Sequence, residues 1–311
     1  MLLLLISTAS AATLDVGPNA KYNTIQKAVD AAKDGDTIRV APGTYKENVK
    51  IDNKTISLNG TKYPTVYGFD FESEDHVEFT HSLNINGFKI SRDGVTFTDS
   101  LSSPSPITTV RNNYFLNCNI TLVHRKAGIS VINNQFLGTN AGIRAYESSY
   151  DKVTGNKFIN CEKAAIIQLG SIMKLSGNTF TKCGNCVYSS EGYFGEVSDN
   201  TFSQCQDGAQ FTGYTDVNKI STNSFTKCGT GLSVIDESTV NEVIGNTFSQ
   251  CKKGLYAESL FNSPTFGKVT KNTFTKCDVG VTLVGIPIDP FTGNKYIKNK
   301  KNIEIIKAIE E

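Results

Sequence analysis

Residues 200–211 read NTFSQCQDGAQF, and this stretch decides the fold because its pattern recurs along the chain. The recurring phrase is Asn-x-(Phe/Tyr), usually with a Cys three residues after the aromatic residue. It begins at nine asparagines, which are Asn113, Asn134, Asn156, Asn178, Asn200, Asn223, Asn246, Asn272 and Asn294. Neighbouring starts lie 21 to 26 residues apart. A period of this size indicates one supersecondary unit stacked on copies of itself.

Each unit carries the period-two pattern of strands. A small residue, usually Gly, follows three residues after the Cys position and opens a run of alternating apolar residues, as in 208–211 and 231–234. Such alternation places one side chain inward and the next outward. Another apolar residue precedes most of the asparagines by three positions, so a unit holds about three short strands. We therefore predict an all-β fold, a parallel β-helix with about 22 residues per coil.

A leucine-rich repeat is the alternative fold, because its period and its Asn/Cys column overlap with this pattern. That fold requires an L-x-x-L-x-L run, which these units lack. The sequence therefore favours the β-helix.

Stacking the coils about 4.8 Å apart places equivalent residues directly above one another. The Asn column is expected at a turn that tolerates left-handed backbone, with each amide bonding backbone groups of the next coil. Each aromatic ring would remove roughly 150–250 Å² from water, so the aromatic column should supply much of the core energy. That column contains Phe115, Phe136, Phe158, Phe180, Phe202, Phe225, Phe248 and Phe274 and is continued by Tyr296.

Seven of the eight cysteines occupy one repeat column, and Cys186 is the exception. We expect a ladder of small, buried and mostly free thiols, although stacked neighbours lie within disulfide reach. Cys186 forms a C-x-x-C spacing with Cys183, but the βαβ context of a redox site and a second pair for a metal are both missing. With three His and two Met there is no dense copper-ligand set, so no metal site is predicted.

The two ends of the chain differ from the repeats. Residues 1–12 combine a short apolar run with small residues and predict a signal peptide. Residues 24–32 have an N-cap and an apolar face typical of a helix, and residues 303–309 resemble a second short helix. We predict a single β-helix domain at 13–311, with an N-terminal cap helix and first coil at 13–60, irregular early coils at 61–110, regular repeats at 111–298 and a C-terminal helical cap at 299–311.

The segments 22–32, YNTIQKAVDAA, and 35–48, GDTIRVAPGTYKEN, resemble the N-terminal cap and first coil of the pectin-lyase-like superfamily. They are especially similar to NosD-like proteins, a group of carbohydrate-binding proteins and sugar hydrolases, and exported surface proteins of methanogenic archaea also resemble the chain. The resemblance continues through 54–58, KTISL, and 85–90, INGFKI. It implies a right-handed, single-stranded β-helix, but an activity only where catalytic residues match.

The catalytic phrases of pectin methylesterases, polygalacturonases and pectate lyases do not occur in this chain. The segment Tyr67-Gly68-Phe69-Asp70 resembles the start of an alginate epimerase and lyase signature, but Phe-Glu-Ser follows where that signature has Pro-His-Asp or Pro-His-Glu. An ordinary strand and turn is the alternative interpretation, with the nearby histidines on surface loops. This second candidate region comprises Tyr67, Asp70, His76 and His81.

Outward positions of the strand after the small residue should form columns one coil apart. Aromatic rings with amides and charges suit a sugar-binding strip, because flat rings contact apolar sugar faces and polar groups bind hydroxyls. Polar outward positions that simply meet water are the alternative. The candidate strip is Arg144, Tyr146, Gln168, Tyr188, Gln210, Tyr256 and Glu258.

Acidic residues in the loop after that strand offer a different function. Paired carboxylates about 5–9 Å apart can perform acid/base hydrolysis of a glycosidic bond. The candidates are Glu191, Asp216 and Glu237, although almost any array of acidic loops supplies such pairs.

Charge excludes other classes of partner. With 31 basic and 30 acidic residues the net charge is +1, which gives nucleic-acid binding little support. No apolar run is long enough to span a membrane. We predict an exported, non-catalytic protein, secreted or at the cell surface, that binds polysaccharide or a cell-surface glycan. The alternative is a lyase, epimerase or glycoside hydrolase with unfamiliar site residues; no cofactor is predicted beyond a conceivable Ca²⁺.

Overall fold

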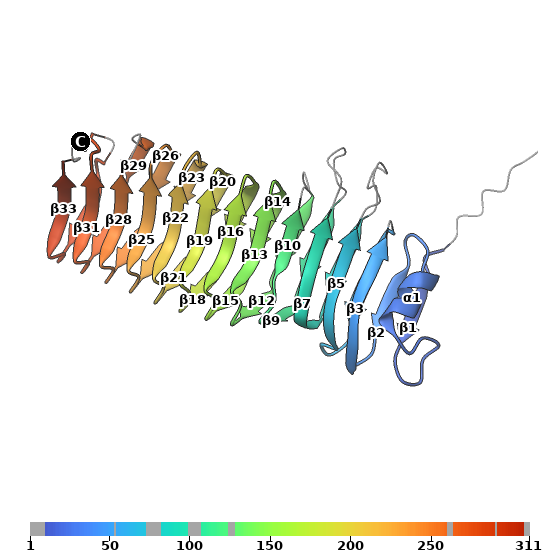
Figure 1. The fold of residues 1–311 in the computed structure, drawn as a ribbon. Helices are drawn as coiled ribbons and strands as arrows, with labels where there is room; N and C mark the ends of the chain where they lie inside the picture. Colours follow the sequence, from blue (N-terminus) through green and yellow to red (C-terminus); the bar gives the residue numbers. More distant parts are fainter. Residues whose placement is uncertain are drawn as a thin grey trace, which may run out of the picture.

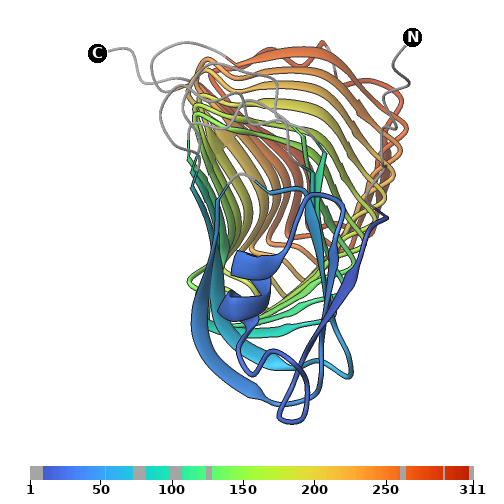
Figure 2. The ribbon, with the colours of Figure 1, turned by 90° about the vertical axis from the view of Figure 1, so that its right-hand side faces the viewer.

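The computed structural model describes residues 10–52, 54–72, 82–98, 107–123, 128–259, 264–289 and 291–307. These residues form an elongated stack of coils that runs from the N-terminal to the C-terminal end (Figure 1). Viewed along the stack, the coils wind around a common interior (Figure 2). The predicted all-β parallel β-helix is confirmed, with two parallel sheets that bend into three faces.

Face 1 is a single sheet, in which each strand pairs in parallel with the strand of the next coil. Its strands are β1 Thr13–Val16, β2 Thr37–Val40, β4 Ile56–Gly60, β6 Leu83–Asn86, β8 Thr108–Arg111, β11 Ile129–Ile132, β14 Ser149–Thr154, β17 Ser171–Ser176, β20 Tyr193–Ser198, β23 Asp216–Ser221, β26 Thr239–Ile244 and β29 Thr265–Thr270.

Faces 2 and 3 belong to the other sheet and begin as three long strands, β3 Thr44–Asp52, β5 Thr65–Glu72 and β7 Lys89–Thr98. Beyond β7 the sheet divides, because β9 pairs with the start of β7 and β10 with its end. Face 2 then contains the short strands β9 Tyr114–Leu116, β12 Gln135–Leu137, β15 Lys157–Ile159, β18 Thr179–Thr181, β21 Thr201–Ser203, β24 Ser224–Thr226, β27 Thr247–Ser249, β30 Thr273–Thr275 and β32 Lys295–Ile297.

Face 3 is the row of arrows that runs along the stack in Figure 1. Its strands are β10 Ile120–Val123, β13 Ala141–Tyr146, β16 Lys163–Gln168, β19 Asn185–Ser190, β22 Asp207–Thr212, β25 Thr230–Ile235, β28 Lys253–Glu258, β31 Val279–Val284 and β33 Lys301–Ile306. A regular coil thus has three strands, one on each face, as the sequence predicts.

The repeated asparagine lies buried at the corner between faces 1 and 2 and joins three coils. The Asn200 Oδ1 accepts hydrogen bonds from the backbone N and the Nδ2 of Asn178, at 3.0 and 2.9 Å. Its own Nδ2 donates to the Leu175 carbonyl at 2.9 Å and to Asn223 Oδ1 at 3.0 Å. The same pattern repeats from Asn113 to Asn294. The predicted amide ladder is therefore confirmed.

The left-handed backbone conformation falls on the residue before the ladder asparagine, which corrects the sequence-based expectation. Asn133, Asp199 and Thr222 have φ values of 55°, 56° and 54° at this position. The asparagine itself has its side chain inside the coil and all its amide atoms engaged. Its neighbour therefore makes the turn.

The predicted aromatic column is confirmed as a continuous stack from Phe115 to Tyr296. Successive ring centroids lie 4.5–5.3 Å apart, and successive ring planes differ by 3–11°. The phenylalanines of the stack are completely buried. Small interplanar angles mean that one coil is nearly a pure translation of the one before, so columns on the outside stay in register too.

All eight cysteines are buried and free. In the regular coils each ladder thiol donates to the carbonyl of the stack phenylalanine in the preceding coil, as in Cys183 to Phe158 at 3.6 Å. The thiols thus satisfy a backbone acceptor within the core.

The helix α1, Ile25–Ala31, confirms the predicted N-terminal cap helix. The Thr24 hydroxyl caps it by accepting from the Lys27 backbone N at 3.3 Å. Ile25, Ala28 and Val29 are buried, and α1 lies across the open end of the stack (Figure 2).

The predicted C-terminal helix is wrong where the structure describes it, because residues 301–306 form strand β33. Ile303 and Ile305 lie in register with Val281 and Leu283, so the segment continues the inward column of face 3. It also gains main-chain bonds, including one from Gly285 N to the Ile306 carbonyl at 2.9 Å. The apolar spacing that resembles a helix serves a strand instead; residues 308–311 and the signal peptide residues 1–9 lie outside the described residues.

Replacing Asn200 by Ala should destabilise the fold strongly, because it removes four ladder bonds and leaves buried polar atoms on three coils unpaired. Each such atom costs about 1–3 kcal/mol, so we expect a loss of about 3 kcal/mol or more in urea unfolding. Thr201→Ala, one residue along and exposed, is the control and should change stability by less than about 0.5 kcal/mol. Similar losses for both variants would contradict a ladder role.

Replacing Leu169 should stabilise the fold, because Leu169 has a branched, exposed side chain at a corner where its φ is 52°. Left-handed geometry costs a non-glycine residue about 1–2 kcal/mol, so Leu169→Gly is expected to stabilise the chain by about 1 kcal/mol in thermal unfolding. Destabilisation by this substitution would show that the Leu169 side chain contributes packing that outweighs the strain.

Candidate functional site

Face 1 has an outward column of alternating charges. Lys174, Glu196, Lys219, Glu242 and Lys268 succeed one another in register across five coils. The Lys174 Nζ lies 3.3 Å from a Glu196 carboxylate oxygen. Lys152 is in register with Lys174, so the column holds four lysines and two glutamates, and each glutamate lies between two lysines that offset its charge.

Face 2 presents mainly hydroxyl groups. From β18 to β30 the two outward positions of each short strand are Thr or Ser. Such a surface lacks the aromatic and charged side chains that the sequence analysis assigns to a binding strip.

Face 3 brings most of the predicted strip into one column. Strand register places Arg144, Ile166, Tyr188 and Gln210 on successive coils. The column continues through Ser233 to Tyr256. A second column two residues along contains Tyr146 next to Gln168, and Glu258 further down the stack.

The second candidate region shares this face. Asp70 is in register with Thr96, Thr96 with Thr121, and Thr121 with Arg144. Asp70, which the sequence analysis assigns to a separate region, therefore belongs to the same column as the strip residue Arg144. Tyr67 lies half-buried on the same strand as Asp70, whereas His76 and His81 lie outside the described residues.

The strip tyrosines are held by neighbouring side chains. The Lys253 Nζ lies 3.9 Å from the ring centroid of Tyr256, and the Lys163 Nζ lies 5.7 Å from that of Tyr188. Burial and a hydrogen bond to Glu258 raise the pKa of the Tyr256 phenol. These contacts restrict the half-buried rings before any ligand arrives, which lowers the entropy cost of binding.

Amide groups lie between the tyrosines. The Asn185 Nδ2 donates to the Gln210 Oε1 at 3.2 Å, which orients the Gln210 amide on the coil after Tyr188. A ring followed by an oriented amide is an arrangement that can bind a sugar face and its hydroxyls.

The candidate carboxylates separate into two places. Glu191 and Glu237 belong to the corner that follows face 3 and surround Tyr214, whose pKa is raised by a hydrogen bond to Glu237 and by the charges of both groups. Asp216 lies outward on β23 of face 1, in register with Tyr193. Asp216 is therefore not on the same side of the corner as the other two.

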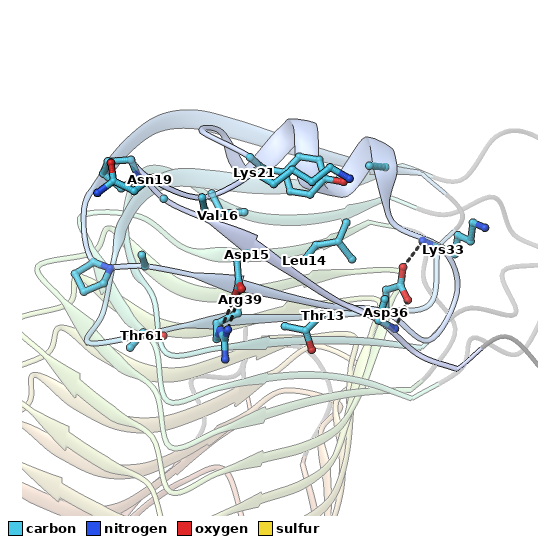
Figure 3. A pocket seen from close by; sticks show the side chains of 18 of the residues that line it. Thr13, Leu14, Asp15, Val16, Asn19, Lys21, Lys33, Asp36, Arg39 and Thr61 are labelled. Atoms are coloured by element: carbon cyan, nitrogen blue, oxygen red, sulfur yellow. Dashed lines mark hydrogen bonds and ion pairs between the residues drawn. The ribbon is translucent and has the colours of Figure 1, made fainter.

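A cavity of about 1140 Å³ lies at the N-terminal end (Figure 3). Asp15, Asp36 and Arg39 in its lining are engaged within the chain. The Arg39 Nε and Nη2 donate to the two Asp15 carboxylate oxygens at 2.7 and 2.9 Å. The Asp36 carboxylate accepts from the backbone N of Lys33 at 2.8 Å and of Ala12 at 2.7 Å, which lowers its pKa. These contacts hold the cap together, and none of the predicted site residues lines this cavity.

Sequence reasoning missed one functional candidate, Arg92. It lies on β7 beside Tyr67, with its guanidinium carbon 5.1 Å from the ring centroid, and it lines a groove that also contains Arg144. The available signal was Arg92-Asp93-Gly94, a turn-like phrase inside an otherwise regular strand.

Metal ligands do not gather in the part of the chain that the structure describes. No group of three or more His, Cys, Asp or Glu side chains there could hold a metal ion. The single described helix, α1, has seven residues, and no helix of the described chain is long and apolar enough to cross a membrane.

The fold is a parallel β-helix whose face 3 carries a column of mainly polar and aromatic residues. A family model described as "Periplasmic copper-binding protein (NosD)" matches residues 29–230, more than half of the chain. The chain belongs to this NosD family, whose description places its members in the periplasm. Among curated proteins, none matches the chain significantly.

Three solved structures match the chain at low similarity. ORF18 of Geobacillus virus E2 is 15% identical, with a TM-score of 0.32, over 80% of this chain and 57% of its own. Tailspike protein 3 of bacteriophage CBA120 is 11% identical, with a TM-score of 0.28, over 90% of this chain and 56% of its own. An alginate lyase from Paenibacillus sp. strain FPU-7 is 11% identical, with a TM-score of 0.23, over 94% and 99%. The chain thus spans just over half the length of the two viral proteins.

Removing the Asp36 carboxylate should weaken the cap in a pH-dependent way. In the folded protein the pKa of Asp36 lies below the ordinary value of 3.8. The Asp36 carboxylate therefore stabilises the fold fully above pH 3.8, and this stabilisation is lost as the pH falls through the lowered pKa. Asp36→Ala is expected to lower the thermal unfolding midpoint at neutral pH, and the difference from the parent chain should shrink in acid. A difference that is constant across the acid range would contradict this role.

Proposed function

We propose that this protein is an exported β-helix protein without catalytic activity, secreted or at the cell surface, that binds polysaccharide along face 3. The observation that carries the proposal is the continuous column from Asp70 through Arg144, Tyr188 and Gln210 to Tyr256. A polymer is a repeating ligand, and a column of side chains on successive coils offers it repeating contacts.

The other two faces support this choice by contrast. Face 1 has a column of lysines and glutamates, and face 2 has mainly hydroxyls over its regular coils. Face 3 combines half-buried rings with oriented amides and charges, which is the composition of sugar sites. The sequence lacks the catalytic motifs of pectin-degrading enzymes, which favours binding without cleavage.

The family description names copper, but we do not propose copper binding for this chain. The described residues do not fit a copper site, because their thiols are buried and donate to backbone carbonyls and no cluster of suitable ligands exists among them.

Polysaccharide cleavage is the second candidate function, and one observation favours it. Glu191 and Glu237 surround Tyr214 at the corner beside face 3. They lie on coils two apart, which corresponds to about 9–10 Å and is near the upper limit for an inverting pair. Shortened or unsaturated products from a polysaccharide panel that disappear with Glu237→Gln would establish cleavage and overturn the non-catalytic proposal.

The binding proposal predicts that Tyr188→Ala combined with Tyr256→Ala lowers polysaccharide retention by about tenfold or more, about 1.4 kcal/mol, in a pull-down with insoluble or immobilised glycans. Tyr193→Ala is the matched control, because Tyr193 is an exposed strand tyrosine on face 1. Its retention should equal that of the parent chain. Equal retention by the double variant and the control would exclude face 3 as the binding surface.

A further inference from the structure

A groove of about 400 Å³ runs along the corner where faces 2 and 3 meet, at the N-terminal part of the stack. It spans three consecutive coils and opens onto face 3 at Arg144, so it adjoins the proposed glycan strip. Its lining is largely polar and consists of Arg92, Asn117, Cys118, Asn119, Gly138, Asn140, Ala141 and Arg144.

The backbone that presents Arg92 is irregular. Strands β5 and β7 shift register between Val66 and Gly68, so a bulge places Arg92 out of the ladder beside Tyr67. Arg92 has φ 120°, a conformation that non-glycine residues rarely adopt. Bulges re-aim side chains, and backbone strain of this kind concentrates at binding sites.

The turn that follows fixes the groove wall. Gly94 has φ 81°, and a Cβ at this position would collide with the backbone of Asn119 on the next coil. The glycine therefore lets the bulge approach the corner that contains Asn119. This close approach brings the Arg92 segment and the asparagines into one groove.

The two guanidinium groups have little compensation within the chain. The Arg92 Nε lies 3.9 Å from an Asp93 carboxylate oxygen, a long contact between side chains that are 68% and 41% exposed. Arg144 is exposed and has no carboxylate partner among the described residues. The groove thus holds two positive charges against one carboxylate, in a chain whose net charge is only +1.

The asparagines add donors. The Asn119 Oδ1 accepts from the Thr121 hydroxyl at 3.2 Å, which leaves the Asn119 amide N–H groups to donate. Guanidinium groups bind carboxylate and sulfate oxygens in a planar, two-bond geometry, and amide donors bind the remaining oxygens or neighbouring hydroxyls. The groove therefore has the chemistry of a site for one anionic sugar.

We propose that this groove is a subsite for a single carboxylate- or sulfate-bearing sugar unit of the glycan that lies along face 3. The proposal rests on the proposed function for the identity of the ligand as a glycan, and it adds selectivity for charge. Because only two arginines line this groove, selectivity should be local, unlike the extended basic surface that binds polyanions.

The direct test compares three trisaccharides by titration calorimetry: a galacturonic acid trimer, its carboxyl-reduced neutral counterpart, and a sulfated galactose trimer. The parent chain should bind at least one charged trimer about tenfold more tightly than the neutral one, and added salt should weaken that preference. The charged trimer that binds more tightly identifies carboxylate or sulfate as the anionic group that the groove prefers. Equal binding of all three, or no binding, would overturn the subsite.

Variants locate the preference. Arg92→Gln combined with Arg144→Gln should abolish the charge preference, whereas Arg111→Gln, an exposed arginine of face 1, should leave it within about twofold. Asp93→Asn removes the opposing carboxylate and should strengthen charged-trimer binding several-fold, which tests the groove independently of the arginine variants. An unchanged preference in the arginine double variant, or weaker binding by Asp93→Asn, would contradict the proposal.

The two proposals fail in different ways. If Tyr188→Ala with Tyr256→Ala abolishes retention of neutral polymer but charged trimers still show no preference, face 3 binding stands and the subsite is excluded. If charged trimers bind through the arginines while no polymer is retained, the groove binds an anionic sugar, and extended binding of a polymer along face 3 is excluded.

Discussion

The asparagine ladder is the constraint on which the rest of the structure depends. Each ladder amide forms hydrogen bonds with the coil before and the coil after. These bonds hold neighbouring coils at a fixed spacing and orientation. The phenylalanine rings of successive coils are nearly parallel, which shows that each coil is almost a translation of the one before. Because buried polar atoms would be left unpaired by any slip, the ladder specifies register as well as stability.

Translation of the coils is what converts a repeated sequence into a surface. Positions that recur in every coil become columns whose successive residues lie about 4.8 Å apart, and each face then differs only in the residues of its columns. Face 1 carries a column of lysines and glutamates and face 2 carries hydroxyls, whereas face 3 combines half-buried rings with an oriented amide and basic groups. The function that we propose follows from this division, and the groove arises where the regular columns are interrupted by a bulge.

The regular coils could be predicted from the sequence because each of their residues obeys a local rule. The aromatic, asparagine and face 3 columns follow from spacing alone, as Phe202, Asn200 and Tyr188 illustrate. Two features depend on contacts between distant segments and could not be derived this way. The left-handed turn falls on Asp199 and not on Asn200, since the buried amide is committed to its bonds. Residues 301–306 form a strand because pairing with β31 outweighs their helical spacing.

The candidate site shows the same limit. Asp70 and Arg144 are far apart in the sequence and lie in the irregular and the regular coils, so only the strand register reveals that they share a column. Arg92 could not be predicted as a site residue, because its position depends on a bulge that the repeat spacing does not reveal.

The central claim is that face 3 is the surface that binds glycan, and hydroxyl-radical footprinting with mass spectrometry tests it most directly. With a polysaccharide that the protein retains, the account predicts that oxidation of Tyr188 and Tyr256 falls while that of Tyr193 on face 1 is unchanged. Protection of Tyr193 with undiminished oxidation of Tyr188 and Tyr256 would contradict it.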